Sequence, residues 1–204
     1  MVCQHGRIDL TIVPANQATW EDLQAVFGTT GEPAHCFCQR YKGAYWGPID
    51  PIADEAQAGA LREQTCCDDP DSPETSGLVA FLDGEPAGWC AVEPRSAYSH
   101  LKRTPWTGRE EDKDDPTVWA VTCFVVRVGY RRQGISGELA RAAVDFARER
   151  GARALEAYAM WTEPGKDIAW GELHVGAANT LADAGFREVS RPSKRRVVMR
   201  IDFA

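Results

Sequence analysis

The chain has 204 residues, of which 44% are hydrophobic and 26% are charged, so we expect a single globular domain that spans residues 1–204. A formal net charge of −7 and a pI near 5.2 disfavour a nucleic-acid partner, because a surface that binds nucleic acid normally carries a basic stripe. No run approaches the roughly 18 apolar residues of a membrane helix, and the first residues lack the apolar core of a secretion signal, so we expect a cytoplasmic protein without a membrane partner.

The N-terminal part predicts a strand followed by a helix. Apolar and polar residues alternate over Arg7–Val13, which is the two-residue period of a strand. A 3.6-residue apolar stripe then predicts a helix over Trp20–Phe27, with Asn16 or Thr19 as its cap and Gly28 as its stop.

The next segment, Thr29–Pro51, is dense in cysteine and aromatic residues and lacks a regular period, so we expect a loop or a short irregular helix. Its aromatic side chains have two interpretations. They pack in the core, or they wall the pocket of an acceptor substrate, for which rigid apolar rings with polar tips are suited. The residues concerned are Phe37, Tyr41, Tyr45 and Trp46.

The cysteines raise the separate question of a metal. His35, Cys36 and Cys38, completed by Cys66 and Cys67, have the ligand types of a tetrahedral zinc site. Their spacing does not fit the usual paired knuckles, and free thiols packed among aromatic rings account for the same residues. We therefore expect no metal, and a cysteine-based metal-binding structural module stays as an alternative.

The middle of the chain predicts a helix, a hairpin and a long loop. Ala53–Cys66 reads as a helix, and the strands Gly77–Leu82 and Pro86–Val92 are joined through Asp83-Gly84, a strong hairpin turn. The stretch Arg95–Pro116 has no core pattern. Its basic front and acidic rear suit a lid or an interface, although a solvated charge run is the default interpretation.

The stretch Thr117–Gly151 has the strongest pattern in the chain. A near-continuous apolar run predicts a central strand, buried on both faces, over Val118–Val128. A turn with glycines and two arginines, Arg131 and Arg132, follows, and from Gly134 the apolar residues recur with the period of a helix.

A strand that runs through such a turn into a helix is suited to bind phosphate, because the first helical N–H groups have no intrahelical partner and the helix dipole favours an anion. The segment GYRRQGIS nearly fits the nucleotide P-loop, but Ile135 stands where that motif has its lysine. The glycine spacing does not match a dinucleotide motif either. An ordinary strand, turn and helix without a ligand stays as an alternative.

The segment RRQGIS resembles the signature [QR]-x-x-G-x-[GA] of the Gcn5-related N-acetyltransferase (GNAT) superfamily, with Ser136 in place of the usual Gly or Ala. The resemblance implies that the helix start holds the pyrophosphate of acetyl-CoA, the co-substrate. It also implies that Phe124–Val126 contact the pantetheine and acetyl groups through their main chain, and that one of their N–H groups stabilises the oxyanion. The implied donor-binding residues are Phe124, Val125, Val126, Arg131, Arg132, Gln133, Gly134, Ile135, Ser136 and Gly137.

The same resemblance implies an α/β (mixed α+β) GNAT-like single domain. Its sheet is twisted, mixed and mostly antiparallel, with about six or seven strands flanked by about four helices, and its fourth and fifth strands splay apart. We expect the fifth strand over Ala152–Met160, a helix over Glu172–Ala184 and the last strands over Phe186–Val189 and Val197–Phe203.

The segment LADAGFREVSR resembles the family's ending L-Y-x-x-x-G-F, in which the Tyr is general acid to the leaving thiolate. Leu181 occupies that position here and cannot donate a proton. The catalytic candidates are therefore Glu93, Tyr158 and His174, with Glu156 as a further candidate base, although a water relay or a free amine can replace a dedicated base. A covalent acyl group on Cys123 is another hypothesis, against which stands packing as a buried thiol.

The resemblance, closest to bacterial members of unassigned substrate, implies direct transfer of an acetyl (acyl) group from acetyl-CoA to a primary amine in a ternary complex. The acceptor partner is a small molecule or a protein, and the enzyme is a monomer or homodimer. Because the usual Tyr is missing at Leu181, a catalytically silent acyl-CoA-binding sensor is the main alternative.

Overall fold

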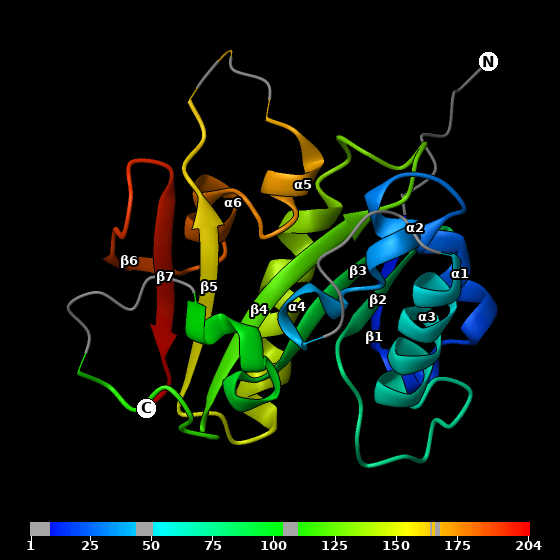
Figure 1. Cartoon of the computed structure of the whole chain (residues 1–204), viewed down its shortest axis with the longest axis horizontal. Helices are drawn as coiled ribbons and strands as arrows, with labels where there is room; N and C mark the ends of the chain where they lie inside the picture. Colours follow the sequence, from blue (N-terminus) through cyan, green and yellow to red (C-terminus); the bar gives the residue numbers. More distant parts are fainter. Residues whose placement is uncertain (1–8, 44–50, 104–109, 164, 166–167) are drawn as a thin grey trace, which may run out of the picture.

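The computed structural model describes residues 9–43, 51–103, 110–163, 165 and 168–204. In this part of the chain a seven-stranded sheet has the order β1-β2-β3-β4-β5-β7-β6. Helices cover both of its faces (Figure 1), with α4 and α6 on one face and α1 and α3 on the other. No helix among the described residues combines the length and hydropathy that crossing a bilayer requires.

The strands are β1 Leu10–Pro14, β2 Leu78–Leu82, β3 Glu85–Pro94, β4 Val118–Val126, β5 Ala154–Met160, β6 Arg187–Ser190 and β7 Arg196–Asp202. The α-helices are α1 Trp20–Phe27, α2 Glu32–Cys36, α3 Pro51–Thr65, α4 Ile135–Glu149, α5 Trp170–Leu173 and α6 Ala178–Asp183. Short 3₁₀ turns are η1 Ala15–Gln17, η2 Gln39–Tyr41, η3 Arg95–Ala97 and η4 Ser99–Arg103. The mixed, mostly antiparallel sheet confirms the fold class expected from the sequence.

Helix α1 begins at Thr19, one of the two caps that the sequence allowed. The Thr19 hydroxyl accepts a hydrogen bond from the Asp22 N–H at 3.1 Å, and the Asp22 carboxylate accepts one from the Thr19 N–H at 2.9 Å, which is a complete capping box. Asn16 has another role. It is buried, and its amide nitrogen donates to three carbonyl oxygens of loop 69–72, which it holds against the start of the chain.

Strand β4 is the centre of the sheet, and its residues are buried from Val118 to Val125. It pairs with β3 in antiparallel fashion as far as Val126, but it pairs with β5 in parallel only over Val118–Val121. Beyond that point β4 and β5 separate, which confirms the splay expected from the sequence.

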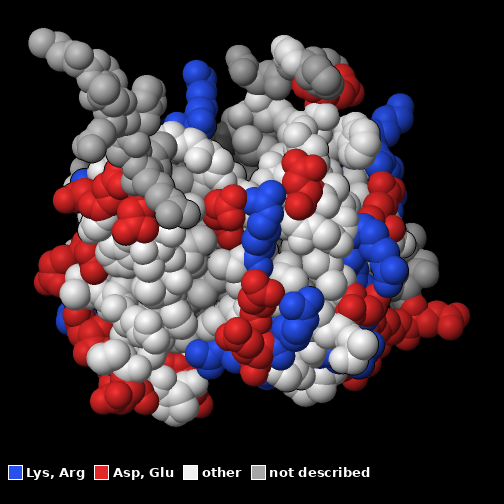
Figure 2. Space-filling model, turned by 180° about the vertical axis from the view of Figure 1, so that it is seen from behind, with Lys and Arg blue, Asp and Glu red and all other residues white. Residues whose placement is uncertain are grey.

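Helix α4 packs closely on the β3–β4 side of this splay. A Cβ atom added at Gly88 of β3 would lie 2.8 Å from Ile135 in the first turn of α4, so only glycine permits this approach. The outer side of α4 alternates acidic and basic residues, such as the pair Glu138–Arg141 at 2.7 Å. Figure 2 shows this mixture on the α4 side of the molecule, where no continuous basic stripe runs across the described residues.

The single helix predicted over Glu172–Ala184 is wrong, because α5 and α6 are separated by four residues. The reason is tertiary. The Phe124 N–H of β4 donates to the His174 carbonyl at 2.6 Å, and the Met160 N–H of β5 donates to the Gly176 carbonyl at 2.9 Å. Gly176 adopts φ +91°, outside the helical region, so the chain leaves the helix to pair with both strands.

The loop after β3 also departs from expectation, because its first arginine is buried rather than solvated. The Arg95 side chain is 1% exposed, and its Nη1 lies 3.2 Å from Oε2 of the fully buried Glu156 on β5. Its Nε donates to the Lys113 carbonyl at 3.0 Å. The described part of this loop is therefore fastened to the sheet.

A second arginine completes the buried cluster. Arg200 of β7 lies 2.7 Å from Glu156 and 3.0 Å from Glu111, so Glu156 is flanked by two guanidinium groups. At the surface Arg153 pairs with Glu111 at 3.1 Å and with Asp115 at 2.7 Å. These ion pairs join the loop to β5 and β7.

We predict that Glu156→Gln lowers the free energy of unfolding by about 3 kcal/mol, because it removes the buried carboxylate between Arg95 and Arg200 and leaves them only the more exposed Glu111 as a shared counter-charge. Urea unfolding followed by circular dichroism measures this change. Glu188→Gln is the control, since its partner Arg191 lies 2.6 Å away at the solvated surface. An equal loss in both variants would contradict this role of Glu156.

Candidate active site

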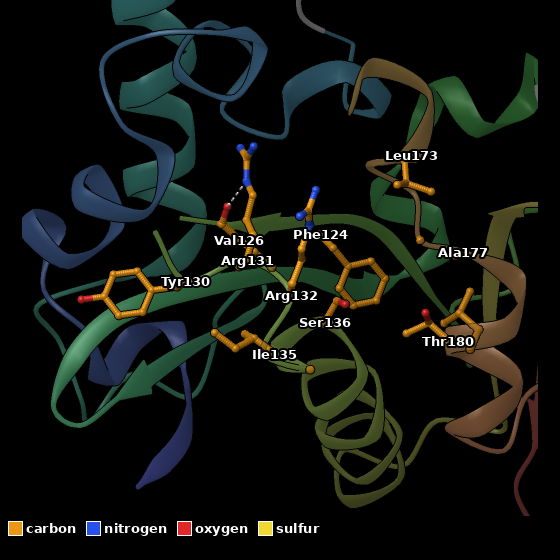
Figure 3. A pocket seen from close by; sticks show the side chains of 13 residues that line it. Phe124, Val126, Tyr130, Arg131, Arg132, Ile135, Ser136, Leu173, Ala177 and Thr180 are labelled. Carbon is orange, nitrogen blue, oxygen red and sulfur yellow. Dashed lines mark hydrogen bonds between the residues drawn. The ribbon is translucent and has the colours of Figure 1, made fainter. Parts of the chain in front are cut away.

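A cavity of about 270 Å³ opens between the second half of β4, the first turn of α4 and the segment that joins α5 to α6 (Figure 3). Seven of the ten predicted donor-binding residues line it, and none of the lining side chains is a carboxylate. The lining consists of Phe124, Val126, Tyr130, Arg131, Arg132, Gly134, Ile135, Ser136, Leu173, Gly176, Ala177, Thr180 and Leu181.

The first turn of α4 supplies the polar part of this cavity. Gly134 caps the helix at φ +82°, and the first N–H groups that bond back to its carbonyl are those of Gly137 at 2.9 Å and Glu138 at 3.2 Å. The N–H groups of Ile135 and Ser136 precede these donors and have no main-chain acceptor among the described residues. Free N–H groups at the positive end of a fifteen-residue helix are suited to bind an anion.

Two arginines add positive charge beside this turn. The Arg131 Nε donates to the Val126 carbonyl at 3.2 Å, which fixes the base of its guanidinium to the end of β4. Figure 3 shows the guanidinium groups of Arg131 and Arg132 extending to the same side of the helix start. Arginine binds phosphate oxygens through several N–H groups at once, so the pair suits a phosphorylated ligand.

The main chain of β4 explains which residues face the splay. The Arg127 N–H donates to the Ala87 carbonyl of β3 at 2.9 Å, and N–H directions alternate along a strand. The Val125 N–H therefore faces β3, whereas the N–H groups of Phe124 and Val126 face the opening between β4 and β5. The Phe124 N–H meets the His174 carbonyl there.

Three predicted donor-binding residues are absent from the lining: Val125, described above, and Gln133 and Gly137. The Gln133 side chain donates to the Gly129 carbonyl at 3.4 Å and so braces the turn. Gly137 lies in the first turn of α4, and a Cβ there would meet Arg141 and Thr180 at ordinary contact distances. Both residues support the shape of the turn.

The family profile described as Acetyltransferase (GNAT) family matches residues 39–171, which is more than half of the chain. The chain belongs to the GNAT family. A search of curated proteins found no match. The matched range includes the segment RRQGIS, which ends at Ser136.

Solved structures show the same fold at low sequence identity. An N-acetyltransferase from Staphylococcus aureus Mu50 is 13% identical with a TM-score of 0.53, and the match covers 95% of this chain and 98% of that one. A GCN5-related N-acetyltransferase from Kribbella flavida is 17% identical with a TM-score of 0.52, covering 95% and 98%. An aminoglycoside acetyltransferase in complex with coenzyme A and kanamycin is 18% identical with a TM-score of 0.52, covering 95% of each chain.

Several cavity residues of this GNAT protein were missed in the sequence. Gly176, Ala177 and Thr180 line the cavity beside Leu181. Their small size was visible, but the residues were assigned to a continuous helix, which would have turned them differently. Leu181 has no exposed surface and lies in the cavity wall.

A second cavity of about 500 Å³ reaches the same end of β4 and shares Val126 and Arg131 with the first. It is also lined by residues 25–33, from the end of α1 to the start of α2, and by Ala169 and Gly171. Two hollows therefore meet where β4 ends.

The predicted acceptor-pocket residues have different positions. Phe37 is a core residue, since its ring stacks on that of Phe27 at 5.3 Å between centroids and is 9% exposed. Tyr41 is half-buried and stacks on the His174 ring at 6.0 Å between centroids. Tyr45 and Trp46 lie outside the described residues.

His174 is the one catalytic candidate that touches β4 at the splay. It is 4% exposed, and its Nδ1 lies 3.0 Å from the Gly171 carbonyl oxygen. A carbonyl only accepts, so we assign a proton to Nδ1, and Nε2 lies 3.5 Å from the Tyr41 hydroxyl. Burial raises the pKa of Tyr41, which keeps that hydroxyl protonated at neutral pH.

The other two candidates lie away from the cavity lining. Glu93 pairs with Lys42 at 2.5 Å and stands opposite Ala120, four residues before Phe124, which is roughly 13 Å along the strand. The Tyr158 hydroxyl donates to Glu156 at 3.1 Å within the buried cluster. Their catalytic roles stay predictions.

The described cysteines are free thiols, and no group of three or more His, Cys, Asp or Glu among the described residues is placed to hold a metal. A hydrogen bond with Cys38, and then burial, hold the pKa of Cys123 well above its usual range. Burial also raises the pKa of Cys90. A thiol in this state is a poor nucleophile, which disfavours the acyl-cysteine hypothesis.

We predict that iodoacetamide at pH 8 alkylates Cys66, which is partly exposed, well before Cys123. The raised pKa of Cys123 lowers its thiolate fraction, and its burial excludes the reagent. Peptide mass spectrometry over a time course measures the two rates. Equal rates in the folded protein would show that Cys123 is accessible and activated.

Proposed function

We propose that the chain is an acetyl-CoA-dependent N-acyltransferase that transfers an acetyl group to a primary amine of a small molecule or a protein by direct attack in a ternary complex. The observation that carries the proposal is the cavity in which the first turn of α4 meets the splayed edge of β4. Membership of the GNAT family supports acyl transfer, and the family's donor is acetyl-CoA.

The chain's residues suit the donor in two parts. The N–H groups of Ile135 and Ser136, with Arg131 and Arg132, would hold the pyrophosphate, because they combine a helix dipole with charge-assisted donors. The exposed edge of β4 would hold the amide-bearing pantetheine arm by pairing with it as another strand does. Acetyl-CoA has an anionic pyrophosphate and an extended polar arm, which matches the order of these two sets of contacts.

For the proton transfers we favour His174 among the three sequence candidates. With its Nδ1–H directed at the Gly171 carbonyl, the ring would exchange a proton with a substrate through Nε2, and the main chain of His174 contacts β4 at the splay. The half-buried Tyr41 beside it extends this polar path toward the surface. The aminoglycoside acetyltransferase with a similar fold binds kanamycin, an amine, which accords with an amine acceptor here.

A catalytically silent acyl-CoA sensor is the second candidate. The observation that favours it is Leu181, which is fully buried in the cavity wall. By the resemblance of LADAGF to the family's ending, this leucine replaces the usual proton donor. We further propose a cytoplasmic single domain over residues 1–204 that acts as a monomer or homodimer, without a metal, a nucleic acid or a membrane as partner.

We predict that Gly134→Glu reduces acetyl-CoA affinity at least 100-fold in isothermal titration, because it places a carboxylate at the anion site. Gly129→Glu is the matched control. Gly129 also has a positive φ, at +95° against +82°, and neither position has a neighbour within 4 Å of an added Cβ, but Gly129 does not line the cavity. Retained binding in folded Gly134→Glu, or equal loss in both variants, would reject the site.

A measurement of turnover distinguishes the acyltransferase from the catalytically silent sensor. Release of the coenzyme A thiol is followed while pools of small amines and of lysine peptides are added to the protein and acetyl-CoA. We expect release with at least one pool and none with Gly134→Glu. Tight binding of acetyl-CoA without release in any pool would favour the sensor.

A further inference from the structure

The donor group on β4 that faces the cavity is already bonded within the protein. The Phe124 N–H donates to the His174 carbonyl at 2.6 Å, and Phe124 is 6% exposed. A short, buried hydrogen bond of this kind occupies the single proton of the N–H. A carbonyl of an incoming ligand therefore competes with His174 for the Phe124 N–H.

The His174 carbonyl is held in place by its own segment, residues 171–176. At one end the Gly176 carbonyl accepts from the Met160 N–H of β5 at 2.9 Å. At the other end the Gly171 carbonyl accepts from Arg40 Nη1 at 2.9 Å and from the His174 ring at 3.0 Å. The segment thus bridges β5 and η2 and contacts β4 at its middle.

Arg40 joins this segment to the second cavity. Its Nη2 donates to the Glu32 carboxylate at 2.9 Å, and Glu32 lines that cavity. The Glu32 carboxylate lies so near Gly171 that an added Cβ would be 2.5 Å from its oxygen. One guanidinium therefore fixes both the lining of the second cavity and residues 171–176.

We propose that Arg40 is a positioning residue that holds residues 171–176 against β4 and thereby controls the availability of the Phe124 N–H to the carbonyl of an acyl-CoA. This proposal rests on the proposed function, in which acyl-CoA is the donor. The exchange replaces one carbonyl by another, so the N–H has a partner both before and after it. Because Arg40 also holds Glu32, contacts in the second cavity change the same equilibrium, and acceptor and donor binding are coupled.

Amide hydrogen exchange by NMR tests, without any ligand, whether Arg40 stabilises the hydrogen bond between the Phe124 N–H and the His174 carbonyl; we call this bond the lock. Arg40→Ala removes a charged donor to the Gly171 carbonyl, so Phe124 should exchange about 10-fold faster than in the wild type. The Val125 amide, which faces β3, is the internal reference, because general loss of stability accelerates both amides and local release accelerates only Phe124. Arg195→Ala is the matched control, since within the described part of the chain the Arg195 side chain pairs with the exposed Glu172 side chain of α5, at 2.7 Å.

Arg40→Lys provides a second variant that keeps the charge. An ammonium group cannot serve Gly171 and Glu32 with the fixed fork of a guanidinium, so we expect a smaller acceleration of Phe124, about threefold. Unchanged Phe124 exchange in both Arg40 variants would overturn the proposal. Equal acceleration of Phe124 and Val125, or the same effect in Arg195→Ala, would also overturn it.

Addition of acetyl-CoA separates this proposal from the proposed function. If Arg40 holds the lock, the association rate measured by stopped flow should level off at high acetyl-CoA, and the plateau should rise about 10-fold in Arg40→Ala. The Phe124 amide resonance should shift on binding. Binding that leaves this resonance unmoved would contradict the lock alone, whereas absence of any binding would reject the acyl-CoA function.

Discussion

The structure of the candidate site depends on the hydrogen bonding of one edge of strand β4. Strand β4 is bonded to β3 along its length, but β5 leaves it after Val121. Each buried N–H and carbonyl on the β5 side beyond that residue needs another partner, because an unpaired polar group in the core costs free energy. On this edge the Phe124 N–H bonds to the His174 carbonyl, and in our proposal a ligand carbonyl competes for the same N–H.

The anion site depends on the same strand. Gly88 lets α4 pack closely on β3, which brings the first turn of α4 to the end of β4. The positive helix terminus and the open strand edge thus form one continuous surface within a chain of net charge −7. A ligand with phosphates at one end and amide groups along an extended arm is complementary to both parts, which is why the donor can be inferred more readily than the acceptor.

The sequence predicted the parts of this site that depend on local pattern. The apolar run of β4, the glycine turn and the 3.6-residue period of α4 are each visible over fewer than about 20 residues. The break between α5 and α6 is not local. The residues around His174 have a helical pattern, and hydrogen bonds to Phe124 and Met160, which are distant in sequence, draw them out of the helix.

Arg95 shows that the positions of charged residues are also hard to predict from local sequence. In the sequence it begins a polar loop, and its partners Glu156 and Arg200 belong to strands that come much later. The cluster is buried because of the order of the strands in the sheet, and this order cannot be read from amino-acid composition. Glu93 and Tyr158 show the same limit: each is a plausible acid or base in the sequence, but in the fold Glu93 pairs with Lys42 and Tyr158 donates to Glu156.

A crystal structure of the protein with acetyl-CoA tests the central claim most directly. The account predicts the pyrophosphate within hydrogen-bond distance of the Ile135 and Ser136 N–H groups and the pantetheine arm along the open edge of β4. Acetyl-CoA bound elsewhere, with the first turn of α4 facing only solvent, would contradict it.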